Sequence, residues 1–124
     1  DNAKHAVKKG GIIILVAACT EGLGGGSFEK WMIEFEKPEL MIEEIRKNFI
    51  LGGHKAAAIA LILKNAEIYL VSDMDPSLAG NIFMKPFREP QQALDEALGR
   101  KGKDALVHII PFGGSILPSY TANN

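Results

Sequence analysis

The stretch IIILVAACTEGLGGGSFEKW, residues 12–31, joins an apolar run to a cluster of glycines and then to an amphipathic segment. Its opening run, residues 12–17, holds β-branched and aliphatic side chains without a polar break. Such a run is typical of a strand buried on both faces, as the strands of a parallel sheet are. The glycines then mark a loop at the carboxyl end of that strand, and Ser27 is the expected N-cap of a helix through residue 36. The stretch predicts a strand–loop–helix unit.

Strand and helix patterns alternate along the rest of the chain. Pro38 and Pro90 each fit the first position of a helix. Asp75 is the expected N-cap of another, short helix between them. Residues 54–65 predict a helix with almost no polar face, packed against the sheet. Further strands are expected at residues 68–72, 82–87 and 105–110. This order predicts a three-layer α/β sandwich with a mainly parallel, Rossmann-like sheet and right-handed crossovers.

The composition fits one globular α/β domain spanning residues 1–124, because 47% of the residues are hydrophobic and 23% are charged. The 14 basic residues nearly balance the 15 acidic ones, so the chain carries no charge footprint for nucleic acid or an anionic membrane. The longest apolar runs fall far short of the ~20 residues of a spanning helix. The single Cys19 allows no internal disulfide and no cysteine zinc site, and a cytoplasmic location is the resulting expectation.

The amino-terminal segment predicts that more chain lies upstream. The first residue is Asp rather than Met, and residues 1–9 resemble the last turn of a helix that Gly10 and Gly11 terminate. We therefore expect a part of a longer protein, whose active-site residues can lie before residue 1.

The glycine loop is the first candidate for a binding site, since loops at the carboxyl ends of parallel strands form the ligand crevice of open α/β sheets. Glycines there let backbone N–H groups approach an anion. The loop match to the G-x-G-x-x-G dinucleotide pattern is only half complete, and no acidic strand end follows about 20 residues later. A phosphate cradle, a substrate-binding edge without phosphate and a simple turn all stay open. The candidate residues are Glu21, Gly22, Gly24 and Gly25.

A second candidate lies at the stretch GGHKA, where His54 and Lys55 follow two glycines at a predicted helix start. The helix dipole disfavours a protonated histidine there, so a neutral imidazole that donates or accepts a hydrogen bond is expected. An ordinary surface helix start is the alternative interpretation.

Two further candidates follow predicted strands. Asp73 comes directly after the second strand, and Gly113, Gly114 and Ser115 come after the last one. We expect these residues to line one crevice with the glycine loop, because the carboxyl ends of parallel strands meet at one edge of the sheet. No catalytic triad, acid pair or metal-ligand set is complete, so no catalytic or metal-binding residue is assigned.

Three segments, taken in their order, resemble the C-terminal domain of the nickel-pincer lactate racemase family. They are AVKKGGIIILVAACTEGLGGGSFEKW at residues 6–31, LGGHKAAAIALILKNAEIYLVSDMDP at 51–76 and PQQALDEALGRKGKDALVHIIPFGGSILP at 90–118. The resemblance covers nearly all of the chain. The order of the motifs and the spacing between them are more specific than any single motif.

The resemblance implies a two-domain enzyme that racemises or epimerises 2-hydroxy acids by hydride transfer. The implied cofactor is a nickel-pincer nucleotide, tethered to a lysine of the N-terminal domain, and this domain alone is expected to bind none. The N-terminal domain supplies the acid/base and nickel-ligating histidines in the family, so those roles are not carried over to His5, His54 or His108. The implied partners are that catalytic domain of the same chain and a small hydroxy acid, with no nucleic acid and no membrane.

The chain departs from the family pattern in two places, and the second affects the expected substrate. Some members carry a Gln-x-x-Lys motif before the first strand; this chain shows none, so the motif is expected upstream. Lactate racemases also have an aromatic residue near the GGHKA region, where this chain has His54, so a bulkier or more polar hydroxy acid than lactate is expected. The alternative function is a non-catalytic α/β ligand-binding or interaction module on the same scaffold.

Overall fold

The computed structural model describes residues 1–119 and contains a parallel three-stranded sheet. Its strands are β1 (Gly11–Val16), β2 (Ala66–Val71) and β3 (Lys85–Phe87), in the order β1-β2-β3. β1 and β2 pair along their whole length, with Gly11 opposite Ala66 and Val16 opposite Val71. The predicted α/β class with a parallel sheet is confirmed.

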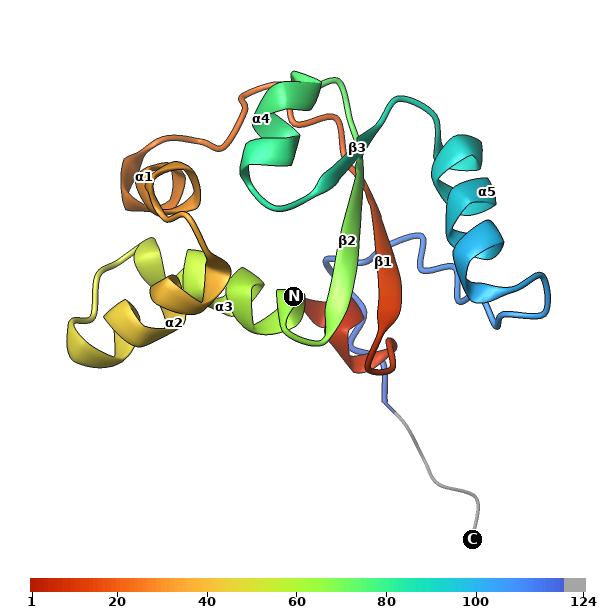
Figure 1. Ribbon diagram of the computed structural model, residues 1–124, viewed down its shortest axis with the longest axis horizontal. Coiled ribbons are helices and arrows are strands. Elements are labelled where there is room, and N and C mark those ends of the chain that lie inside the picture. The colour runs from red at the N-terminus through yellow and green to blue at the C-terminus, as the bar shows by residue number, and fades with distance from the viewer. Residues whose placement is uncertain (120–124) are drawn as a thin grey trace, which may run out of the picture.

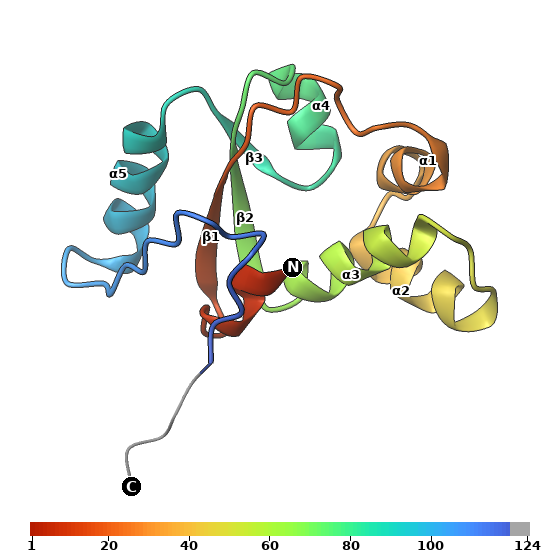
Figure 2. The same ribbon diagram turned by 180° about the vertical axis from the view of Figure 1, so that it is seen from behind.

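Helices cover both faces of the sheet (Figures 1 and 2). One face carries α5 alone, and the other carries the helices that precede it. After a short 3-10 helix η1 (Asn2–His5), the helices are α1 (Gly26–Glu34), α2 (Pro38–Lys47), α3 (Gly53–Leu63), α4 (Pro76–Asn81) and α5 (Pro90–Lys101).

Two apolar clusters explain why the β2 sequence is apolar almost throughout. Ile68 and Leu70 belong to the cluster shared with α1 to α4, whereas Tyr69 and Val71 belong to the cluster shared with α5. Successive side chains of a strand point to opposite faces, so a strand covered on both sides needs apolar residues at every position. Only Glu67 at its start departs from the pattern.

Arg100, in the last turn of α5, fixes that helix to the sheet. Its guanidinium donates two hydrogen bonds of 2.6 Å to the Glu67 carboxylate and one of 2.8 Å to the hydroxyl of the buried Tyr69. The hydrogen bonds from Arg100 lower the pKa of Glu67, and those to Glu67 and Tyr69 raise the pKa of Arg100. The two parallel hydrogen bonds fix the orientation of the guanidinium against the carboxylate, in addition to pairing their charges.

The expected strand at residues 105–110 is absent, and this prediction was wrong. Leu106 is 83% exposed and Ile109 is 86% exposed, and His108 is exposed too. No backbone hydrogen bond joins this segment to another element within residues 1–119, so β1 has β2 as its single described neighbour. The apolar pattern was the only signal for a strand, and apolarity does not say which surface the side chains cover.

Smaller differences concern where elements begin. The N-cap position of α1 is Gly25 rather than Ser27, and the Glu29 carboxylate accepts a 2.8 Å hydrogen bond from the Gly25 N–H. β3 is shorter than expected because α4 extends to Asn81 and a turn follows, in which Phe83 adopts a φ of 66°.

The close approach of α3 to α1 gives a stability prediction. A Cβ on Gly53 would lie 2.8 Å from Cε2 of the buried Trp31, so Gly53→Ala should destabilise the fold by about 1–3 kcal/mol through overpacking. A Cβ on Gly99 in α5 would meet no atom within 4 Å, so Gly99→Ala should stabilise the fold by about 0.5–1 kcal/mol. Urea unfolding measures both, and equal stability of Gly53→Ala and wild type would contradict the packing argument.

Candidate functional site

The first turns of α1 and α3 meet, and we call this contact the helix junction. It consists of Gly25, Gly26 and Ser27 on one side and Gly52, Gly53 and His54 on the other. A Cβ on Gly52 would lie 3.1 Å from the Phe28 nitrogen and 3.3 Å from the Ser27 Cβ, so the two segments are in direct contact. The amino ends of two helices therefore lie side by side, and the Glu29 carboxylate already accepts a hydrogen bond from Gly25 N–H at the α1 end.

The glycine loop leads from β1 to this junction. Gly22, Gly24, Gly25 and Gly26 have φ angles of 64°, 80°, 75° and 67°. Only glycine adopts such angles without strain, which explains why the loop is built from glycines. No atom lies within 4 Å of the Cβ positions of Gly22, Gly24 and Gly26, so this backbone is open to an approaching ligand.

His54 has a defined orientation at the start of α3. Its Nδ1 accepts a 3.1 Å hydrogen bond from the Gly52 N–H, and its ring lies 5.5 Å from the ring of Phe49. A neutral imidazole that accepts at Nδ1 carries its proton on Nε2, so Nε2–H is the donor that His54 can offer. Lys55 follows on the exposed side and adds a positive charge to the junction.

Asp73 lies at the other end of the glycine loop. Its N–H donates a 3.2 Å hydrogen bond to the Ala18 carbonyl, which ties the loop after β2 to the loop after β1 at the carboxyl edge of the sheet. The structure thus places Asp73 where the glycine loop begins and His54 beside the place where it ends. Glu21 belongs to the glycine loop and is exposed.

Residues 113–115 lie apart from these groups. The Gly113 carbonyl accepts a 3.1 Å hydrogen bond from Nδ2 of Asn2, so the segment passes beside η1, which precedes β1. Figure 2 shows this part of the chain near the N-terminus and away from the glycine loop. Gly113, Gly114 and Ser115 do not join the other candidates in one crevice here, because the strand expected to carry them there is absent.

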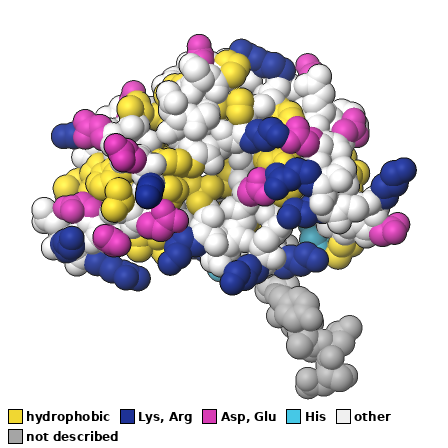
Figure 3. Space-filling model, in the orientation of Figure 1, with side chains coloured by type: hydrophobic (Ala, Val, Ile, Leu, Met, Phe, Trp, Pro, Cys, Tyr) yellow, Lys and Arg dark blue, Asp and Glu magenta, His cyan; other side chains and the backbone are white. Residues whose placement is uncertain are grey.

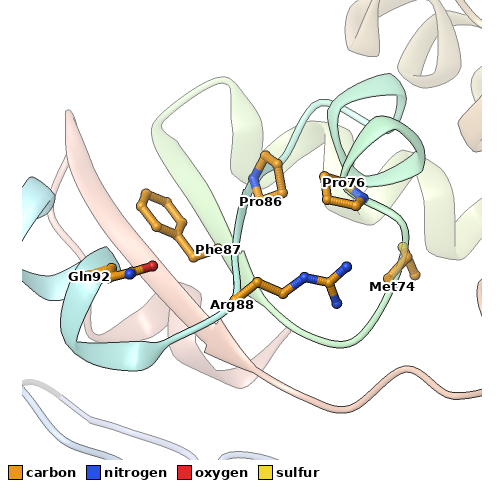
Figure 4. Close-up of a pocket in the computed structure, with 6 residues that line it drawn as sticks. All are labelled: Met74, Pro76, Pro86, Phe87, Arg88 and Gln92. Atoms are coloured by element: carbon orange, nitrogen blue, oxygen red, sulfur yellow. The ribbon is translucent and has the colours of Figure 1, made fainter.

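A pocket that the sequence did not predict opens at the carboxyl edge of β2 and β3 (Figure 4). Its volume is about 230 Å³. The Arg88 guanidinium extends into the hollow between Met74 and Pro76, and one of its nitrogens lies 3.4 Å from the Ser72 carbonyl oxygen. The sequence signal for this pocket was Arg88, a positively charged residue directly after the strand β3. The lining residues are Met74, Pro76, Pro86, Phe87, Arg88 and Gln92.

Neither a metal centre nor a membrane span is found in the part of the chain that the structure describes. No three or more His, Cys, Asp or Glu side chains gather there in a way that could hold a metal ion. Among residues 1–119, no helix has the length and apolar character needed to cross a bilayer.

These features define an α/β domain in which the first turns of two helices meet beside a glycine loop. The family of lactate racemase C-terminal domains matches residues 1–117, and the chain belongs to that family. This confirms the resemblance seen in the sequence motifs.

Two curated relatives and one solved structure agree with this assignment. The chain is 30% identical over 117 residues to a lactate racemase of Thermoanaerobacterium thermosaccharolyticum and 30% identical over 120 residues to one of Lactiplantibacillus plantarum. These alignments cover 90% and 93% of this chain but 28% of each relative. The lactate racemase apoprotein structure from T. thermosaccharolyticum superposes with a TM-score of 0.85 at 28% identity, over 93% of this chain and 29% of that one.

The hydrogen bond at His54 predicts its tautomer. Because Gly52 N–H donates to Nδ1, the neutral ring should be the Nε2–H form. Nitrogen-15 NMR of the imidazoles reports the tautomer directly, with the exposed His108 as the comparison. A neutral His54 that carries its proton on Nδ1 would contradict this geometry.

The Asp75 cap of α4 predicts a pH dependence of stability. Hydrogen bonds from the Ser77 hydroxyl and N–H lower the pKa of Asp75 from its ordinary value of 3.8. A lowered folded-state pKa means that the cap stabilises the fold above about pH 3.8 and that this contribution is lost as the pH falls through the folded pKa. Asp75→Ala should therefore unfold at lower denaturant concentration than wild type near neutral pH, and the gap should close in acid. Asp104→Ala is the control, and a gap that persists in acid would contradict the assignment.

Proposed function

We propose that this chain is the C-terminal, cleft-closing domain of a two-domain 2-hydroxy-acid racemase or epimerase. The observation that carries the proposal is the family match over residues 1–117, in a chain that spans 28% of the length of the lactate racemases it resembles. The helix junction supports it, because a 2-hydroxy acid carries a carboxylate and a hydroxyl, which match the positive charge of Lys55 and the N–H donor of His54.

In this proposal the junction binds and orients the substrate. The helix starts and Lys55 attract the carboxylate, and Nε2–H of His54 donates a hydrogen bond to the carboxylate or the hydroxyl. The glycine loop closes the cleft, since its open backbone and positive φ angles suit a moving segment. Closure excludes water, which strengthens these polar contacts and protects a hydride-transfer reaction.

The nickel-pincer nucleotide that the family resemblance implies does not fit a site made by this chain alone. Residues 1–119 contain no cluster of metal-ligating side chains. When bound in a full-length enzyme, that cofactor supplies the hydride-accepting chemistry. We assign no nickel ligand and no acid or base here, and give this chain the tasks of orienting the substrate and excluding water.

The substrate in this proposal is a hydroxy acid larger or more polar than lactate. The position near the start of α3 is aromatic in lactate racemases proper, by the resemblance described above, and is His54 in this chain. An imidazole that offers Nε2–H can satisfy a polar substituent, which an aromatic hydrocarbon ring cannot.

The second candidate function is a non-catalytic ligand-binding module, and the Arg88 pocket supports it because a guanidinium in a hollow of about 230 Å³ can bind an anion. Calorimetric titration of the full-length protein with small carboxylates and nucleotides distinguishes the two. Binding that Arg88→Ala abolishes and that Lys55→Ala leaves unchanged would favour the module.

Substitutions at the junction test the enzyme proposal. Lys55→Ala and His54→Ala should each raise KM of the full-length racemase by roughly tenfold or more, because a hydrogen bond to a charged group is worth about 1.5–3 kcal/mol. Lys64→Ala, in the C-cap position of the same helix, should leave KM unchanged. Chiral analysis over a panel of 2-hydroxy acids gives the kinetics, and circular dichroism checks folding.

The outcomes of this experiment separate the parts of the proposal. Unchanged kinetics of both junction variants would leave His54 and Lys55 as scaffold residues. Full activity of a nickel-free preparation would remove the hydride-transfer mechanism while leaving the binding role in place.

A further inference from the structure

The carboxyl-terminal part of the described chain exposes an unusual amount of apolar surface. Thirteen large apolar side chains are exposed in residues 1–119, and six of them lie in the twelve residues from 106 to 117. Contiguous apolar patches on a soluble protein mark surfaces that contact another molecule or domain. The six are Leu106, Val107, Ile109, Phe112, Ile116 and Leu117, with exposures from 42% to 86%.

This segment, residues 105–117, is loosely attached to its own domain. Its backbone hydrogen bonds within residues 1–119 are local turns, and its side-chain-mediated bond to the rest is the one from Asn2 to the Gly113 carbonyl. Packing against the α5 and α3 clusters does not hold it either, because none of its residues belongs to those clusters. The segment therefore has a defined position, but its large apolar side chains are not packed into either core cluster.

A groove is lined by residues that follow Asn2 in the chain. It has a volume of about 440 Å³ and lies between the amino-terminal segment and α3, whose Leu61 is 50% exposed. Apolar side chains, including Val7 and Ile62, line it together with Lys4, His5 and Lys9. Both ribbon views show the carboxyl-terminal segment passing close to the N-terminus (Figures 1 and 2).

The face of the molecule seen in Figure 3 has a different character. There, Lys, Arg, Asp and Glu side chains are spread among the apolar ones across the visible surface. A mixed surface of this kind is typical of solvent contact. The apolar segment and the groove are thus the better candidate for a permanent contact.

We propose that residues 105–117, together with the groove between η1 and α3, form the surface on which the N-terminal domain of the same polypeptide packs. This inference rests on the proposed function, because it takes the chain to be the C-terminal domain of a larger racemase. More than two thirds of the length of the curated relatives lies outside the matched part, which supplies a partner large enough to cover the segment.

The position and charge of the surface fit that occupant. The surface lies beside Asn2, whose side chain donates a hydrogen bond to the Gly113 carbonyl. Lys9 on the rim of the groove favours a facing surface that carries a carboxylate, whereas Lys4 is paired with Asp1 at 2.7 Å. The segment then acts as a strap that holds the two domains together beside their covalent connection.

Photo-crosslinking in the full-length protein tests this contact. With p-benzoylphenylalanine in place of Leu106, mass spectrometry should find an intramolecular crosslink to a peptide from outside residues 1–124. A crosslink to residues 11–16 would show the segment paired with the free edge of β1, and a crosslink between two chains would show a second copy. Either of these results, or the absence of any protein crosslink, would overturn the proposal.

A paired variant keeps the test independent of activity. Leu106→Gln with Ile109→Gln should speed hydrogen exchange in residues 105–117 of the full-length protein at least tenfold and split its thermal unfolding into two transitions. Leu40→Gln, at a 41% exposed site on α2, should do neither. Unchanged exchange and a single transition in the double variant would overturn the proposal. Both readouts need neither substrate nor metal, so a protein that shows the docking and lacks racemase activity would refute only the proposed function.

Discussion

The contact between the two glycine-flanked helix starts determines how the rest of this domain is arranged. A Cβ on Gly53 would lie 2.8 Å from Trp31, which leaves no room for it, and one on Gly52 would lie a tight 3.1 Å from the Phe28 nitrogen. This contact brings α3 against α1, and Trp31 completes the cluster that covers one face of the sheet. The same contact places two helix amino ends and the outward N–H of His54 together. In the proposed site, packing and substrate binding therefore depend on the same two glycines, and a side chain there would disturb both.

The parts of the fold that the sequence predicted are those in which local and long-range signals agree. β1 and β2 follow from continuous apolar runs, and α2, α4 and α5 follow from prolines and caps at their first positions. The strand at residues 105–110 failed because its run of apolar residues is also what an interface with another domain requires. A right-handed crossover through α5 would place such a strand beside β1, so the topology was consistent with the error. An apolar pattern indicates that a segment is buried from water. It does not indicate whether the segment is buried in its own sheet or against another domain.

The candidate site was predicted in part for the same reason. His54 and Lys55 were assigned from their position after two glycines, and the structure shows that those glycines set the junction. What the sequence could not give is which loops meet. Asp73 lies where the glycine loop begins, His54 lies beside the place where it ends, and residues 113–115 lie beside η1, so one expected crevice becomes three places. Arg88 and Gln92 were missed because their pocket exists only once α4, β3 and α5 are assembled.

The separation of the candidate residues into three locations is consistent with a domain that forms half of a binding site. A complete pocket needs walls on every side, whereas the helix junction is open and the glycine backbone has no neighbours on its outer side. An enzyme that works by closing two domains must leave such a surface bare on each of them and must also hold the domains in register. A flexible glycine loop cannot do the second task. An apolar segment that is anchored by Asn2 and leaves six large apolar side chains exposed can, and this division of work accounts for both the exposed loop and the exposed segment.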